Sequence, residues 1–222
     1  MNENEFNIRL LSRTCNHRAF ARSTVVSYIQ PMHDVNPEYI RAVFTDAPQH
    51  RTLSLPHYQR SAVLVPLIWR GDQFAFLFTK RTDSVETHKG QVSFPGGVVD
   101  ASDTDDMQTA LREAQEEIGL PPSSVEVVGV LDDLATPTGF VIRPVVGIIG
   151  KVPPLTTNTD EVSEVFEVPL AFFADQTSGR TEAREVRGIH YEMWFYEHGN
   201  HLIWGATATI VRMLLKKLQL VQ

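Results

Sequence analysis

The sequence has almost no cysteine and no long apolar run, and each absence excludes a class of protein. Cys15 is the single cysteine among 222 residues, so the chain cannot close a disulfide on itself, which suits a reducing compartment. No apolar stretch reaches the length that spans a bilayer, and the first residues include Glu3 and Glu5 and lack the apolar core of a signal peptide. We therefore expect a cytoplasmic protein that makes no membrane contact.

The chain also has fewer positively than negatively charged residues. Lys and Arg number 20 against 27 Asp and Glu, which gives a net charge of −7. Proteins that bind nucleic acid in general are usually basic, so we expect no nucleic-acid partner. The same charge repels an anionic substrate at long range, and any phosphate site must therefore carry local cations or a metal ion.

The length and composition fit one domain with a preceding segment. A hydrophobic content of 42% in a chain of this length is enough for a substantial core. We interpret residues 1–55 as an N-terminal arm, with a helix near 39–44, and residues 56–222 as the main domain. Three roles stay open for the arm: to cover the core, to form a dimer contact, or to lie over the site.

Apolar runs predict the main strands of this domain. Residues 61–69 and 74–80 are typical of a hairpin around a short turn, and Pro66 suggests an edge position or a bulge. Residues 140–150 form the longest apolar run and predict a central strand, and residues 206–220 predict the last helix. Shorter strands are expected at 92–94, 125–131, 162–168, 189–197 and 202–205.

A polar run at 101–109 leads into a helix that ends before Gly119. We expect Asp103 or Thr104 to be the N-cap, and Gly119 followed by two prolines to stop the helix. Four apolar residues recur at helical spacing and are expected to pack inward: Met107, Leu111, Ala114 and Ile118.

Three carboxylates, Glu113, Glu116 and Glu117, lie together in the C-terminal half of this helix. Like charges a turn apart repel, and the helix dipole disfavours acids at this end. Arg112 alone is too little to balance three acids, whereas a hard divalent cation such as Mg²⁺, bound by oxygen ligands, would suffice. Taken alone the cluster also fits a solvated acidic face, and the glycines on either side of it favour the metal site.

These residues resemble the box that defines the Nudix family, a loop–helix–loop that binds metal and cleaves diphosphates. Arg112, Glu113, Glu116, Glu117 and Gly119 match its helical half. The preceding loop, from Gly97 to Arg112, is one residue longer than is usual. The acid that normally stands within that loop is replaced by a run of four: Asp100, Asp103, Asp105 and Asp106.

Two further stretches resemble one branch of the family, the coenzyme A diphosphatases. Residues 78–82 and 88–97 look like the signature that precedes the box in those enzymes, which share the longer loop, and residues 204–208 look like their C-terminal part. The resemblance implies an α/β (α+β) fold, an α/β/α sandwich around a mixed sheet. It also implies metal-dependent cleavage of coenzyme A, or its thioesters, into 3′,5′-ADP and (acyl-)4′-phosphopantetheine.

The resemblance further implies roles for individual residues. The helix glutamates, helped by the Gly97 carbonyl, would hold Mg²⁺ or Mn²⁺, and Glu116 would also take part in catalysis. Arg112 would orient a glutamate. A glutamate on the later strand would complete the metal site or act as general base, with Glu161 as the first candidate and Glu164 as the second. The candidate contacts for the small-molecule substrate are Lys80, Arg81, Lys89 and Gly96.

Two other functions stay open. The same chemistry could act on ADP-ribose, a nucleoside-diphosphate sugar or a damaged nucleotide, because pocket shape sets the substrate. A non-catalytic binding module is the second alternative, although a binder has no need of three adjacent carboxylates that repel one another.

Overall fold

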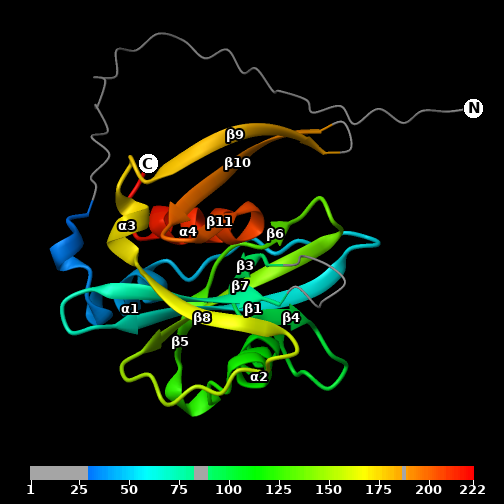
Figure 1. Ribbon diagram of the computed structural model, residues 1–222, viewed down its shortest axis with the longest axis horizontal. Helices are drawn as coiled ribbons and strands as arrows, with labels where there is room; N and C mark the ends of the chain where they lie inside the picture. Colours follow the sequence, from blue (N-terminus) through cyan, green and yellow to red (C-terminus); the bar gives the residue numbers. More distant parts are fainter. Residues whose placement is uncertain (1–29, 83–89, 187–188) are drawn as a thin grey trace, which may run out of the picture.

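The computed structural model describes residues 30–82, 90–186 and 189–222 (Figure 1). Residues 1–29 of the predicted arm, with Cys15, lie outside the described residues. No helix in the described part of the chain is both long and apolar enough to cross a membrane.

A mixed eight-stranded sheet forms the centre of the molecule. Five of its strands follow the order β3-β2-β1-β7-β5, while β4 pairs with β1, β6 with β7 and β8 with β2. β1 (Gln59–Trp69) and β7 (Phe140–Ile149) run parallel and pair along almost their whole length. The other strands of this sheet are β2 (Phe74–Arg81), β3 (Val92–Ser93), β4 (Gly96–Val98), β5 (Glu126–Val130), β6 (Leu134–Ala135) and β8 (Val162–Pro169). The strands predicted from apolar runs are all confirmed within a few residues.

The expectation for Pro66 is wrong, because β1 is a central strand without an edge. On one side it pairs with β7 throughout; on the other, β4 pairs with Ser61–Val63 and β2 with Leu67–Trp69. Pro66 lies in the interval between these two partners. Its missing N–H therefore costs no hydrogen bond to β2 or β4.

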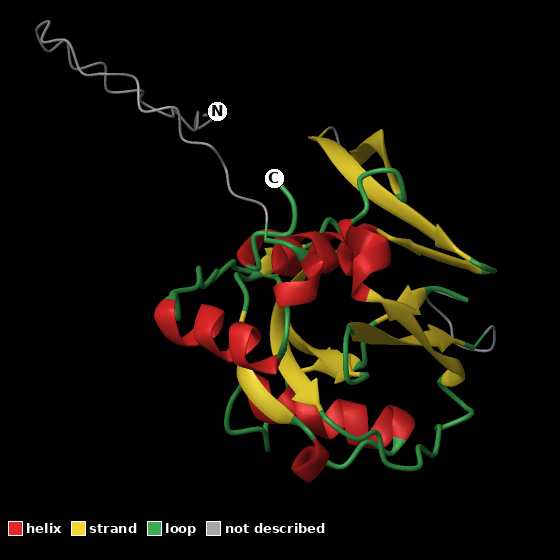
Figure 2. Cartoon of the chain, turned by 90° about the vertical axis from the view of Figure 1, so that its left-hand side faces the viewer, coloured by secondary structure: helices red, strands yellow, loops and turns green. Residues whose placement is uncertain are grey.

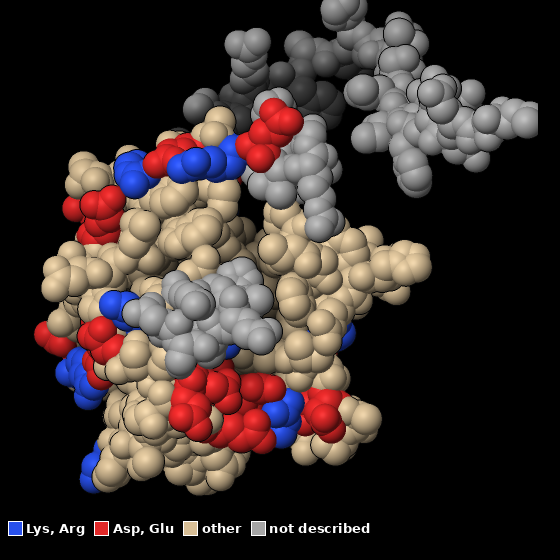
Figure 3. Space-filling view, turned by 45° about the vertical axis from the view of Figure 1, so that its right-hand side comes forward, with Lys and Arg blue, Asp and Glu red and all other residues tan. Residues whose placement is uncertain are grey.

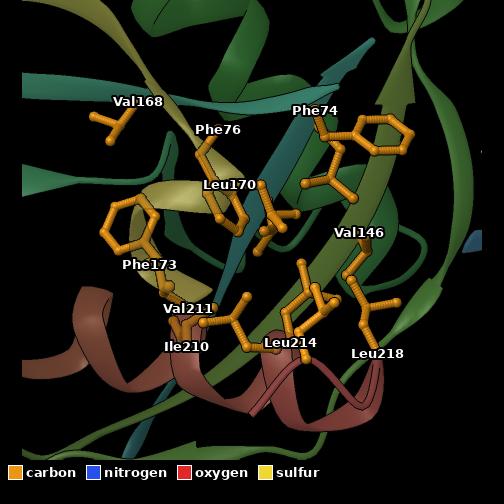
Figure 4. Close-up of a cluster of buried hydrophobic side chains, with 14 of the residues drawn as sticks. Phe74, Phe76, Val146, Val168, Leu170, Phe173, Ile210, Val211, Leu214 and Leu218 are labelled. Atoms are coloured by element: carbon orange, nitrogen blue, oxygen red, sulfur yellow. The ribbon is translucent and has the colours of Figure 1, made fainter. Parts of the chain in front are cut away.

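Helices cover both faces of the sheet, as Figure 2 shows. α2 (Asp106–Ile118) packs on one face against a cluster that includes Leu64 and Leu77. The other face carries α1 (Pro37–Asp46), α3 (Leu170–Ala174) and α4 (Gly205–Lys217). There the side chains of Phe76, Phe173 and Leu214 meet in the larger core (Figure 4). This is the predicted α/β/α arrangement around a mixed sheet.

The described part of the arm packs on the domain. Ile40 and Phe44 of α1 are buried in the larger core. The segment after α1 runs along the sheet, where the backbone N–H of Leu53 donates to the Asp133 carboxylate at 2.7 Å. The 3₁₀ turns at Met32–Asp34 and Pro122–Ser124 complete the described helices.

A second, three-stranded sheet lies over α4 in Figure 1 and has the order β11-β10-β9. Its strands are β9 (Gly179–Val186), β10 (Ile189–His198) and β11 (His201–Trp204). The Arg212 guanidinium of α4 lies over the Trp194 ring of β10, 4.1 Å from its centroid. The hydroxyl of Thr207 in α4 donates to the Val92 carbonyl of β3, and this hydrogen bond joins α4 to the main sheet.

Both details predicted for α2 need correction. The N-cap is Asp105, whose carboxylate accepts from the Gln108 N–H at 2.8 Å, because Asp103 is engaged elsewhere. Met107 is 40% exposed. The inward face is completed instead by Thr109 and Glu117, polar residues that a hydrophobic pattern does not reveal.

Candidate active site

Two glycines of β4 lie in close contact with β1 and α2 at the site. β4 pairs antiparallel with β1, and a β-carbon on Gly96 would lie 2.4 Å from the Ala62 carbonyl oxygen. A β-carbon on Gly97 would lie 2.4 Å from the carboxyl carbon of Glu113. Only glycine at these two positions lets the strand pair with β1 and the Glu113 carboxylate lie against the backbone.

Glu117 is the buried carboxylate of the site. It is 4% exposed, accepts a hydrogen bond from the Gly96 N–H, and its Oε2 has no partner among the described residues. Burial, with the nearby charges of Glu113 and Glu161, raises the pKa of Glu117 to about 8, although Arg81 and the Gly96 N–H act in the opposite direction. A buried anionic oxygen without a partner is costly unless a cation compensates it.

Arg112 ties the loop to the helix. Its guanidinium donates to both oxygens of Asp103 at 3.0 Å, and to Glu113 and Glu116 at 2.9 Å each. The Arg112 hydrogen bonds hold the pKa of Asp103 well below its usual range. Among the four acids of the lengthened loop, Asp103 is therefore the one that pairs with the helix arginine.

Arg81 and Glu161 meet the helix glutamates from the other side. Arg81 ends β2 and lies close enough to favour the charged form of Glu117, and its Nε is buried without a partner among the described residues. Burial raises the pKa of Glu113, and the charges of Glu116 and Glu161 add to the rise, against the effect of Arg112. The structure thus brings Glu113, Glu117, Glu161 and Arg81 together.

Lys80 and Glu164 lie on the opposite face of the sheet. They pair across β2 and β8, and the Glu164 carboxylate is hydrogen-bonded to Nε2 of His201 in the second sheet at 3.0 Å. Successive strand residues point to opposite faces, so Lys80 and Arg81 cannot both face one diphosphate. The structure therefore does not bring Lys80 and Glu164 to the helix glutamates, and Lys89 lies outside the described residues.

The view in Figure 3 shows a patch of acidic side chains in the lower part of the molecule. Within the described residues, no three His, Cys, Asp or Glu side chains already converge as a metal cage. Two of the helix carboxylates are bound by Arg112, which forms ion pairs with Glu113 and with Glu116, whose side chain is 58% exposed. The unpartnered Glu117 oxygen, next to Glu113 and Glu161, still offers the hard oxygen donors that Mg²⁺ or Mn²⁺ requires, so these residues fit such an ion.

Sequence reasoning missed one residue of this site, Asn158, and it expected only a glutamate as the partner of Arg112, so the pairing with Asp103 was missed as well. Asn158 donates from its side-chain amide to the Glu161 carboxylate at 3.2 Å. The available signal was weak: an Asn three residues before a candidate glutamate, at a turn.

Comparison with known proteins identifies the family of this chain. The model of the NUDIX domain matches residues 58–196. Proteins called uncharacterized Nudix hydrolase NudL are 44% identical in Escherichia fergusonii and 43% in Cronobacter sakazakii, in each case over 75% of this chain and 86% of the relative. The solved structure of a MutT/nudix family protein from Enterococcus faecalis is 17% identical, with a TM-score of 0.48 over 81% of this chain and 73% of that one.

The chain belongs to the Nudix family. It is a Nudix hydrolase, in which Glu113 of α2 lies against Gly97 of β4.

Proposed function

We propose that this protein hydrolyses the phosphoanhydride bond of coenzyme A or its thioesters, releasing 3′,5′-ADP and (acyl-)4′-phosphopantetheine. One observation carries the chemistry: the buried Glu117 carboxylate has an unpartnered oxygen and lies near Glu113, Glu161 and Arg81. Support for the substrate comes from the sequence, through the resemblance of residues 78–82 and 88–97 to coenzyme A diphosphatases. We also propose that this activity is cytoplasmic, which suits a chain whose single cysteine is Cys15.

Glu113 and Glu117 would hold Mg²⁺ or Mn²⁺, with Glu116 and the Gly97 carbonyl as further candidates. When bound, such an ion neutralises phosphoryl oxygens and lowers the pKa of water. Glu161 accepts the proton of the water that attacks phosphorus, while the bridging P–O bond breaks. The Arg81 guanidinium, at the end of β2, binds the phosphate oxygens on which charge develops.

Arg112 acts through other residues. With Asp103, Glu113 and Glu116 as its partners, it holds the helix glutamates in place relative to the loop. Charge-assisted hydrogen bonds of this kind fix geometry as well as adding energy. We therefore assign Arg112 a positioning role.

Hydrolysis of coenzyme A in the presence of Mg²⁺ or Mn²⁺ tests the proposal, with ADP-ribose and a nucleoside-diphosphate sugar as competitors. We expect coenzyme A to be preferred and Glu117→Gln to abolish turnover. Glu167→Gln is the matched control, because Glu167 pairs with Arg70 away from the helix glutamates. Preference for a competitor would overturn the substrate but keep the chemistry. No turnover of any diphosphate would favour a binding module.

A further inference from the structure

Asn158 makes more hydrogen bonds around the site than its loop position suggests. Its backbone N–H donates to the Glu117 carbonyl of α2 at 2.8 Å. Its own carbonyl accepts from the N–H groups of Glu161 at 3.1 Å and Val162 at 2.8 Å. Asn158 therefore joins the end of the glutamate helix to the start of β8.

The side chain of Asn158 continues this connection, and its surroundings fix how the amide is turned. Oδ1 accepts from the Asp160 N–H at 3.2 Å, and the amide oxygen must face this N–H because the amide nitrogen cannot accept a hydrogen bond. The amide nitrogen must therefore face Glu161, to whose Oε1 it donates at 3.2 Å. Among the described residues, no other side chain donates to the Glu161 carboxylate.

The loop that carries Asn158 is docked on the helix end through its backbone. The last carbonyls of a helix lack partners within the helix, and here the Thr156 N–H donates to the Ile118 carbonyl at 3.0 Å. Gly119 has a φ of +67°, and a β-carbon there would lie 3.0 Å from the backbone N and O of Thr156. The glycine that ends the helix thus also lets the loop approach.

Thr82, the residue that follows β2, forms two further hydrogen bonds to the same turn. The Thr82 N–H donates to the Glu161 carbonyl at 3.0 Å, and the Thr82 hydroxyl donates to the Asp160 carbonyl at 3.0 Å. The backbone of the turn is therefore held at both ends without the Asn158 side chain. What that side chain adds is the direction of the Glu161 carboxylate.

We propose that Asn158 is a positioning residue that aims the Glu161 carboxylate at the site formed by Glu113 and Glu117. The expected effect on turnover rests on the proposed function. The expected effect on the position of the Glu161 carboxylate rests on the hydrogen bonds alone. A positioning role predicts that the amide donor of Asn158 matters for turnover and that its acceptor oxygen does not.

Two variants separate the donor from the acceptor. Asn158→Ala removes both but keeps the backbone bonds to Glu117 and to β8. Asn158→Asp keeps an acceptor for the Asp160 N–H and replaces the donor by a carboxylate that repels Glu161. Asn36→Ala is the matched control, since Asn36 accepts from the Tyr39 N–H at the start of α1 and makes a comparable turn contact away from Glu161.

The first experiment is a set of crystal structures of the wild type, Asn158→Ala and Asn158→Asp without substrate. We expect the backbone of residues 156–161 to superimpose while the Glu161 carboxylate leaves its wild-type position in both variants. A carboxylate that stays in place would overturn the proposal. The position of the carboxylate can be measured without any enzymatic activity. These structures therefore test the positioning role of Asn158 even if no diphosphate is cleaved and the proposed function fails.

The second experiment measures turnover of the substrate that the wild type prefers. We expect both variants to lower kcat roughly tenfold to a hundredfold, the range for partners that orient functional groups, with KM within about twofold. A double-mutant cycle with Glu161→Ala should show no further loss from Asn158→Ala, because the amide acts through that carboxylate. Additive losses, or wild-type kcat in Asn158→Asp, would overturn the proposal, whereas Asn36→Ala should keep kcat unchanged.

Discussion

Glu113 packs against Gly97 so closely that a β-carbon at Gly97 would lie 2.4 Å from the carboxyl carbon. We expect Gly97→Ala to displace the Glu113 carboxylate and to weaken Mn²⁺ binding at least about tenfold, because a ligand lost from its place costs affinity. Isothermal titration calorimetry with Mn²⁺ measures this without substrate. Gly150→Ala is the control, since a β-carbon there would meet nothing within 4 Å. Equal affinities in the two variants would contradict the prediction.

The side chains of Glu161 and Glu164 lie at opposite faces of the main sheet. Glu161 lies with the helix glutamates, and Glu164 pairs with His201 on the other face. Glu161→Gln should lower kcat roughly a hundredfold or more, the contribution of a general base. Glu164→Gln should stay within about twofold of the wild type. Steady-state kinetics decides between them, and the reverse order of effects would reassign the base to Glu164.

Asp103 and Asp100 belong to the same loop, but only Asp103 is paired with Arg112. The Asp103 side chain is 1% exposed, and its removal leaves a guanidinium without its main partner. We expect Asp103→Asn to lower the free energy of unfolding by roughly 2 kcal/mol and to reduce kcat, since Arg112 then holds the glutamates less well. Urea denaturation of Asp103→Asn and of Asp100→Asn, which should change little, makes the comparison. Equal losses would remove the special role of Asp103.

Asp133 makes the stability of the fold depend on pH in the acid range. Although burial alone would raise it, hydrogen bonds from Arg143, Arg60 and the Leu53 N–H hold the pKa of this fully buried carboxylate at about 2. Because the folded pKa is below the unfolded one, this contribution to stability is complete above about pH 4 and is lost as the pH falls toward 2. It amounts to roughly 2 kcal/mol.

Denaturation between pH 2 and pH 7 tests this dependence. Asp133→Asn should be less stable than the wild type at neutral pH and should show a flatter decline in acid. Asp46→Asn, at an exposed position, should follow the wild-type curve. A wild-type decline that Asp133→Asn reproduces unchanged would assign the acid sensitivity to other carboxylates.

The local parts of this protein could be predicted from the sequence. Apolar runs predicted the strands other than β4, β6 and β9, and spacing predicted the α2 helix, because neighbours along the chain decide those features. The arginine and three glutamates of the box stand within six residues of one another, from Arg112 to Glu117, so their grouping on one helix surface needed no knowledge of the fold.

Only the tertiary structure decided which residues from elsewhere join that helix. Lys80 and Arg81 are adjacent in sequence, yet they point to opposite faces of the sheet. Glu164 pairs with Lys80 within β8, whereas Glu161 lies in the turn before β8, beside the helix glutamates. The choice of Asp103 among four loop acids depends on the path of the loop back to Arg112. These outcomes follow from strand register and from contacts between distant segments, which a linear sequence specifies only once the whole chain has packed.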